Sequence, residues 1–272
     1  LADLVGADTV IGREGKDVYG EQYAPDVSDH YTMGNSLMFH ATDKGHPVPF
    51  VCPAWVKKYT EEDLKRRDHR ELTSGYWWIE LGGSKLSTID DAEELRDELL
   101  KALYGVWDHI KNGGDHGAEN MELDWVGFLP GKRESRRVLG DYVLKEQDCF
   151  AGARFEDTVA YGGWQIDNHL PGGFNMSGKS ENHLQKLRLK EPYGIPYRSL
   201  YSKNIDNLMF AGRNISASHL AFATTRVMAT CGVIGQAVGT AAALALKQNI
   251  GPADIDVKYL RETLINDGVY LD

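Results

Sequence analysis

Polar side chains collect in a short segment near the carboxyl end of the chain, between an apolar run and a long uncharged stretch. Residues 213–223 carry Asn214, Ser216, Ser218 and His219. These groups can donate or accept hydrogen bonds, and a histidine titrates near neutrality, so His219 could relay a proton. A hydrogen bond within the loop is its alternative role. Ligands of α/β proteins bind where such a loop joins a strand to a helix.

Arg226 is a cation at the start of residues 227–246, which carry no charge. A permanent charge there could hold an anionic substrate or a reduced cofactor. The alternative is a surface charge at a helix start, which is the unfavourable end of the helix dipole for a cation. Arg226 and His219 are therefore the candidate catalytic residues.

Three glycines, Gly232, Gly235 and Gly239, recur on one face of the helix expected from about Thr225 to Lys247. A face without side chains lets a neighbour approach the backbone, either a sheet or a flat ligand. The stretch also has the length of a membrane span, but polar residues dilute it and nothing else in the chain suggests a membrane. We expect a buried helix in a large soluble domain.

Other residues offer simpler chemistry. Arg133, Arg136 and Arg137 could form an anion-binding edge, and a solvated, salt-bridged face with Glu134 between them is the alternative. His169 is a further candidate for contact with a substrate.

Metal and thiol chemistry receive little support from spacing. Cys52, Cys149 and Cys231 form no C-x-x-C pair, so no local redox pair and no iron–sulfur or zinc motif is present. His109 and His116 could suggest a metal, but no second acid–histidine cluster accompanies them. We interpret the segment as a loop that ends a helix and predict no metal site.

The aromatic residues suggest a second class of function, a non-catalytic carbohydrate-binding or interaction module. Tyr76, Trp77, Trp78, Trp125 and Trp164 could stack on a sugar ring. Alternate residues of a strand point to opposite faces, so packing in the core is the competing explanation.

Periodicity predicts the elements that hold these residues. A helix capped by Thr88 is expected over 89–111. A second helix, beginning at Asp256, is expected over 257–266. A short charged helix is expected from Thr60, its cap, to about Leu72. Strands are expected over 36–42, 76–81, 121–129, 137–144 and 207–211.

The composition is that of a globular protein, with 42% hydrophobic and 26% charged residues among 272. Forty acidic and thirty basic side chains give a net charge of −10, which disfavours nucleic acids and anionic membranes as partners. The first residues, from Leu1, read as the middle of a domain, so we expect a piece of a longer protein.

Two stretches, 210–219 and 225–243, resemble the C-terminal FAD-contacting segment of bacterial FAD-dependent oxidoreductases with the glutathione-reductase-like flavin fold. Upstream, 133–144, 163–169 and 193–200 are similar to stretches that occur in the same order in that family.

The resemblance implies FAD as cofactor and hydride transfer between flavin and a small organic substrate. It implies an α+β chain that belongs to an α/β parent: residues 1–35 and 201–272 from the flavin domain and 36–200 from a mixed-sheet substrate domain. The family's G-x-G-x-x-G turn is absent, so the fragment alone is expected to be inactive.

The resemblance also assigns roles to residues. The amino end of the helix after Arg226 would stabilise the reduced flavin, and Arg133, Arg136 and His169 would face the substrate. The cofactor-binding candidates are Gly212, Arg213, Asn214, Ser216, Met228, Thr230, Cys231 and Gly232.

Overall fold

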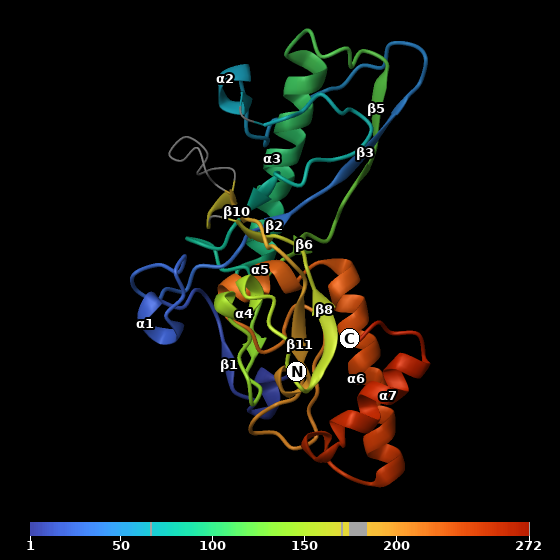
Figure 1. The fold of residues 1–272 in the computed structure, drawn as a ribbon. Helices are drawn as coiled ribbons and strands as arrows, with labels where there is room; N and C mark the ends of the chain where they lie inside the picture. Colours follow the sequence, from blue (N-terminus) through green and yellow to red (C-terminus); the bar gives the residue numbers. More distant parts are fainter. Residues whose placement is uncertain (66, 170, 174–183, 272) are drawn as a thin grey trace. The chain divides into compact units, whose positions relative to one another are not determined.

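The computed structural model describes residues 1–65, 67–169, 171–173 and 184–271. Helices and short strands mix along the chain, and the sheets are small, so the fold class is α+β as predicted. The chain divides into two compact units, whose elements are labelled in Figure 1. One comprises Leu1–Tyr31, Ser135–Asn168 and Leu184–Asp272, and the other Thr32–Glu134 and His169–His183.

The first unit is assembled from three separate stretches of sequence. Its helices are η1 (Asp3–Val5), α1 (Lys16–Tyr19), α4 (Glu146–Phe150), η3 (Tyr197–Ser199), α5 (His219–Thr225), α6 (Met228–Gln248), η4 (Pro252–Asp254) and α7 (Val257–Asn266). Its strands are β1 (Thr9–Val10), β7 (Arg137–Val138), β8 (Thr158–Gly162), β9 (Ile166–His169, whose last residue is assigned to the second unit), β10 (Leu184–Leu187) and β11 (Tyr193–Pro196).

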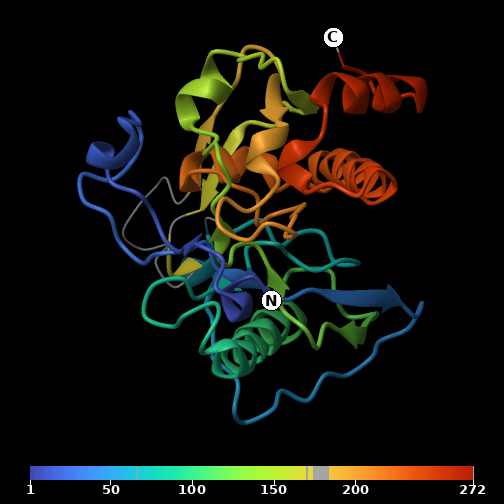
Figure 2. The same ribbon diagram turned by 90° about the horizontal axis from the view of Figure 1, so that it is seen from below.

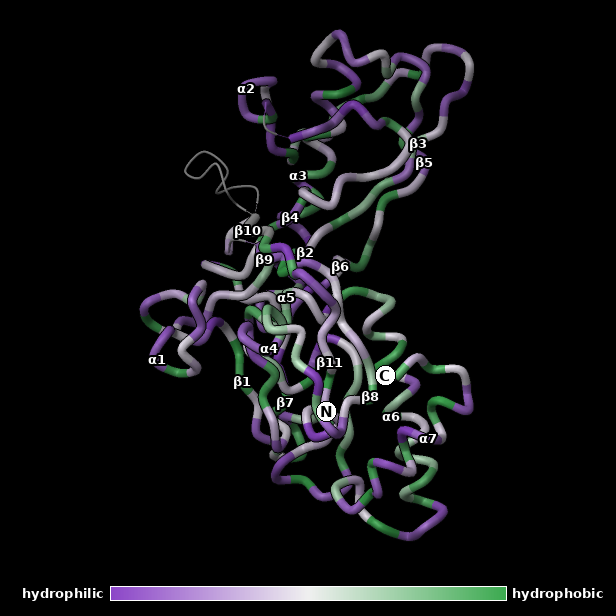
Figure 3. The backbone as a smooth tube through the Cα atoms, in the orientation of Figure 1, coloured by the Kyte–Doolittle hydropathy of each residue, from purple (hydrophilic) through white to green (hydrophobic). Residues whose placement is uncertain are grey.

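Helix α6 covers the antiparallel pair β8–β11 with one face only. Its buried residues include Ile234, Ala237 and Ala241, and the helix packs against β8 and α7 (Figures 1 and 2). The opposite face carries the glycines and is exposed. Most of α6 is hydrophobic (Figure 3), and by length and composition it could cross a membrane, with a third of its apolar window buried.

The second unit consists of one long helix and short antiparallel strands. Its helices are α2 (Glu61–Leu64) and α3 (Ala92–Asn112), and its strands are β2 (Asn35–Ser36), β3 (Phe39–Asp43), β4 (Glu80–Leu81), β5 (Met121–Val126) and β6 (Gly131–Lys132). β4 and β6 flank β2, and β3 pairs with β5 with an irregularity between His40 and Ala41.

The core of the second unit lies along α3. Leu95, Leu99, Leu103 and Trp107 recur at helical spacing and are fully buried, because this face of α3 packs on the aromatic side chains beside β3 and β4, such as Phe39. Burial of this apolar face, more than helix propensity, holds α3 in place.

Several predicted elements differ from the structure in extent. Helix α7 begins at Asp256 as predicted. Helix α2 has the predicted Thr60 capping box but ends at Leu64 rather than near Leu72. The N-cap position of α3 is Asp91, which makes no side-chain cap hydrogen bond, rather than Thr88. The predicted strand at 207–211 is a single bridge between Met209 and Tyr201. The predicted strand at 36–42 is divided between β2 and β3, and the strands predicted at 76–81, 121–129 and 137–144 are shorter than predicted.

The compact units group the chain differently from the division into 1–35, 36–200 and 201–272. Residues 135–168 pack with the carboxyl-terminal stretch, and Thr9–Val10 pairs with Arg137–Val138. The three-domain division therefore stays a prediction about the parent protein.

Candidate functional site

The segment expected to be an eleven-residue loop contains a helix. Ser218 caps α5 by accepting a hydrogen bond from the Ala221 amide at 3.2 Å, and His219 is the first helical residue. The polar loop is therefore shorter than predicted and ends at Ser218. The polar residues of 213–223 do not form one long loop, because no glycine or proline there breaks a helix and the ring of His219 is buried.

Carboxylates close the amino end of α5. Oε2 of Glu14 accepts the His219 amide at 2.9 Å, and Glu21 accepts the Ser218 hydroxyl. Burial is the largest of several influences on the pKa of Glu21, and it raises that pKa. The other oxygen of Glu14 accepts Nη2 of Arg137 at 2.7 Å. These anions already satisfy the end of the helix, so α5 offers no place for the anionic part of a cofactor.

His219 is held by hydrogen bonds. Its side chain is 3% exposed, and Nε2 lies 2.9 Å from Oδ1 of Asn168. This geometry agrees with the alternative role, a hydrogen bond that fixes the start of α5. Proton relay by His219 stays a prediction.

Arg226 ends α5 instead of beginning the long helix. It is the C-cap residue, and its Nη2 donates to the backbone oxygen of Asp167 at 2.9 Å and lies 3.2 Å from Oδ2 of the same residue. A cation is favourable at that end of a helix, so the argument that Arg226 is electrostatically misplaced was wrong. The expected helix from Thr225 is two helices, with extended backbone at Val227 between them.

The amino end of α6 is open. Val227 provides no side-chain cap, the first turn has no acidic residue, and Met228 is 90% exposed. Thr230 is buried. A Cβ atom built on Gly232 would meet nothing within 4 Å. N–H groups that have no partner within the helix and open space at Gly232 therefore coincide at this helix end.

The polar loop lies beside the first turns of α6. Burial raises the pKa of Cys231, and the nearby guanidinium of Arg213 offsets part of this increase. Sγ of Cys231 is 3.5 Å from the Thr225 carbonyl oxygen. Gly212 has φ +99°, which a side chain tolerates poorly, and a Cβ atom at this position would have Oδ1 of Asn214 as its nearest neighbour, at 3.9 Å.

Ser216 is tied into the fold through its backbone. Its amide donates to Ser199 and its carbonyl accepts from Leu144, each at 3.0 Å. Its buried hydroxyl has no hydrogen-bond partner among the described residues. The hydroxyl is thus a buried polar group that makes no hydrogen bond to the described residues.

Two of the predicted substrate residues meet in the second unit, around a buried carboxylate. Nδ1 of His169 lies 2.6 Å from Oε2 of Glu80, and Nη1 of Arg133 lies 3.4 Å from the same oxygen. Oε1 of Glu80 accepts the Gly34 amide at 3.0 Å. The ring of Trp77 packs on His169 edge to face. Glu80 was not singled out in the sequence, because an acid within an aromatic run gives no sign of its partners.

The three arginines expected to share an anion-binding edge are divided between the two units, and the shared edge stays a prediction. Arg136 lies 3.5 Å from Asp3, and Arg137 is buried against Glu14 and the Gly12 carbonyl. These contacts belong to the first unit, whereas Arg133 belongs to the second.

The model of one family, described as FAD dependent oxidoreductase, matches residues 1–264. The chain belongs to this family. No curated protein and no solved structure matches it. The family implies FAD, and residues of this chain fit it at two points: the unobstructed amino end of α6 and the glycine at 212, where a Cβ would be strained.

The aromatic residues of this oxidoreductase give little support to a sugar-binding face. The coplanar pair among the described ring contacts, Tyr76 and Trp78 at an interplanar angle of 3°, is buried. Trp77, Trp125 and Trp164 are exposed but make no described contact with one another.

Proposed function

We propose that this chain supplies the isoalloxazine-facing part of an oxidoreductase that transfers hydride between FAD and a small organic substrate. The observation that carries the proposal is the open amino end of α6, which combines an uncapped first turn with the exposed, unobstructed Gly232. Family membership supports flavin as the group that uses it.

The residues would act on the cofactor by position and charge. The first turn of α6, from Met228 to Gly232, would lie against the pyrimidine end of the flavin, where its amide groups oppose the negative charge of the reduced ring. Gly212 and Arg213 would lie near the ribityl and phosphate region. FAD, when bound, accepts or donates the hydride.

Protein groups near this end would set the surroundings of the reaction. Arg226, held by Asp167, keeps a permanent positive charge two residues before α6. The hydrogen bond between His219 and Asn168 fixes the start of α5, the helix that precedes the turn into α6. We assign Arg226 the role of electrostatic support and His219 that of positioning, with proton relay by His219 as the alternative.

The test is FAD binding by the protein expressed from its complete open reading frame, followed by visible absorbance and quenching of flavin fluorescence. Gly232→Val would place branched carbon where the ring is expected and should weaken FAD binding at least about tenfold, roughly 1.4 kcal/mol. Gly239→Val is the matched control, because it makes the same change on the same exposed face about 10 Å further along the helix.

The two variants separate cofactor binding from stability. Both valines point into open space, so they should have similar and small effects on thermal unfolding. Equal FAD affinity in Gly232→Val and Gly239→Val, or a colourless wild-type protein, would refute the proposal.

A further inference from the structure

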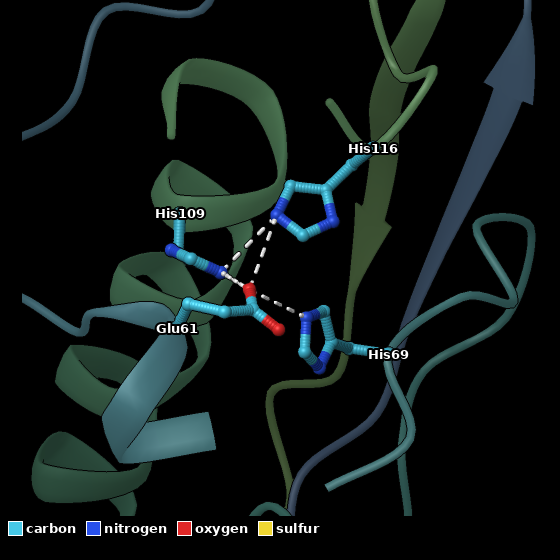
Figure 4. Close-up of side chains that lie close together, drawn as sticks. All are labelled: Glu61, His69, His109 and His116. Carbon is cyan, nitrogen blue, oxygen red and sulfur yellow. Dashed lines mark hydrogen bonds and ion pairs between the residues drawn. The ribbon is translucent and has the colours of Figure 1, made fainter. Parts of the chain in front are cut away.

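Three histidines and one glutamate meet at one point of the second unit. Glu61, His69, His109 and His116 each offer one atom that could ligate a metal, and these atoms lie within 4.8 Å of one another. Figure 4 shows the four side chains converging from separate segments. The cluster lines a pocket of about 1030 Å³. The sequence interpretation of His116 as part of a helix-ending loop rested on the lack of a second acid–histidine group, and Glu61 and His69 supply that group in space.

Four of the six separations among these atoms are close to the edges of a metal tetrahedron, and all six lie within 4.8 Å. Oε2 of Glu61 lies 3.0 Å from Nε2 of His109, 3.5 Å from Nε2 of His69 and 3.8 Å from Nε2 of His116. Nε2 of His116 lies 3.1 Å from Nε2 of His109. Zinc bonds of 2.0–2.2 Å to nitrogen and oxygen give tetrahedral edges of about 3.3–3.5 Å. The four distances bracket that range.

The hydrogen bond of His69 selects the nitrogen that faces the cluster. Its Nδ1 lies 2.6 Å from the Arg67 carbonyl oxygen, which can only accept, so Nδ1 carries the proton. Nε2 then presents a lone pair toward Glu61. A backbone carbonyl on the outer nitrogen is the usual way in which proteins orient a metal-binding histidine.

The backbone brings the other ligands to the same point. His109 lies in the last turn of α3, and the chain then turns back through Gly114, Asp115 and Gly117, all with positive φ, which returns His116 to His109. Glu61 is the first residue of α2, where the Thr60 capping box fixes the helix start. Three separate segments are thus aimed at one position.

A cluster without a metal explains this arrangement less well. The side chains of His69 and His109 are 8% and 6% exposed, and their rings and that of His116 pack on one another at centroid distances of 4.7–5.5 Å. Glu61 is 66% exposed, and an exposed carboxylate gains little from ion pairs. Nε2 atoms of two imidazoles at 3.1 Å repel unless a proton or a cation lies between their lone pairs.

We propose that Glu61, His69, His109 and His116 bind one zinc ion with four protein ligands. Imidazole nitrogens with one carboxylate are a donor set that zinc accepts, and four protein ligands leave no position for a reacting water. The site is therefore structural. It ties the short helix α2 and the following loop to the end of α3, and it is independent of the flavin proposal.

The first test is the metal content of the full chain, produced without a polyhistidine tag and dialysed against metal-free buffer. Elemental mass spectrometry of the protein should find one zinc ion per chain. Competition with a chelator should give the affinity of the protein for zinc. Cobalt substituted for zinc should give the visible absorption of a tetrahedral site. Absence of retained zinc together with failure to take up zinc or cobalt, or uptake of magnesium in preference, would overturn the proposal.

The second test compares variants. His116→Ala and His69→Ala should lower zinc affinity by more than about 100-fold, because loss of an outer hydrogen bond alone costs 10–100-fold. His46→Ala is the matched control, since His46 is an exposed histidine of the same unit and outside the cluster. It should bind zinc as the wild type does. Equal affinity in His116→Ala and His46→Ala would contradict the site.

Glu61→Gln keeps the test decisive if an alanine variant fails to fold. The change is isosteric and exposed, so circular dichroism of the metal-free protein should not change. Zinc affinity should fall about tenfold or more, and zinc should raise the melting temperature of this variant less than that of the wild type. An unchanged zinc affinity in Glu61→Gln would overturn the four-ligand site.

Discussion

The buried pair of Glu14 and Arg137 makes a quantitative prediction about the first unit. The side chain of Arg137 is 1% exposed and that of Glu14 is 11% exposed, with 2.7 Å between Nη2 and Oε1. Glu14→Gln keeps the shape but removes the charge that faces the guanidinium. Removing one partner of a buried pair costs about 3–5 kcal/mol, because the remaining charge is poorly compensated.

The second contact of Glu14 adds to this cost. Its Oε2 accepts the His219 amide at the start of α5, and the glutamine amide can accept at only one of the two positions. Loss of a hydrogen bond at a helix start costs about 0.5–2 kcal/mol. We therefore expect the total loss in the upper part of the range of about 3–5 kcal/mol. With a urea dependence of about 3 kcal/mol per molar, a loss of about 4 kcal/mol lowers the unfolding midpoint by roughly 1.3 M.

The assay is urea unfolding followed by circular dichroism for Glu14→Gln, Arg137→Met and the double variant. The double variant should lose less than the sum of the single ones, because it leaves neither buried charge without its partner. Asp26→Asn in the exposed pair with Lys16 is the control and should leave the midpoint unchanged. A loss below about 1 kcal/mol in Glu14→Gln, or strict additivity, would refute the reasoning.

Three further predictions concern stability. Leu99→Ala in the core of α3 should cost about 2–5 kcal/mol, measured by denaturant unfolding, and a cost below about 1 kcal/mol would mean that the core is not packed as described. Asp256→Ala should cost about 0.5–2 kcal/mol by removing the cap that accepts the Lys258 amide at 2.9 Å, whereas Asp256→Asn should cost little. Burial raises the pKa of Glu21, so between its ordinary value of 4.5 and its folded value the native state holds the proton more tightly, and stability falls as pH rises through that window. In melting curves across pH, Glu21→Gln should flatten this fall, and an unchanged profile would argue against it.

Sequence patterns predicted the elements whose signals are local. Helices α3 and α7 follow from apolar spacing, and the caps of α2 and α7 follow from Thr60 and Asp256. The chain breaks between α5 and α6 at Val227, which adopts extended backbone. No glycine or proline marks this position in the sequence. Local patterns therefore joined two helices into one.

The candidate sites differ in how far the sequence could reach them. The open end of α6 follows a glycine pattern that is visible in the chain, and Gly212 has the positive φ expected of a residue that cannot carry a side chain there. The partners that fix His219 and His169, Asn168 and Glu80, could not be predicted, because they depend on pairings of distant segments. The same holds for Glu61 and His69, which lie about forty residues or more before His109.

The interrupted course of the first unit has a consequence for its synthesis. Glu21 binds the Ser218 hydroxyl, so a contact at the start of the chain waits for a residue made nearly two hundred positions later. At 5–20 residues per second this interval is roughly 10–40 s. During that time the leading stretch can pair with Arg137 and Val138 but not with Ser218, whereas residues 32–134 already contain α3 and the strands that cover it. The yield of this protein should therefore depend on translation speed as well as on the stability of its finished form.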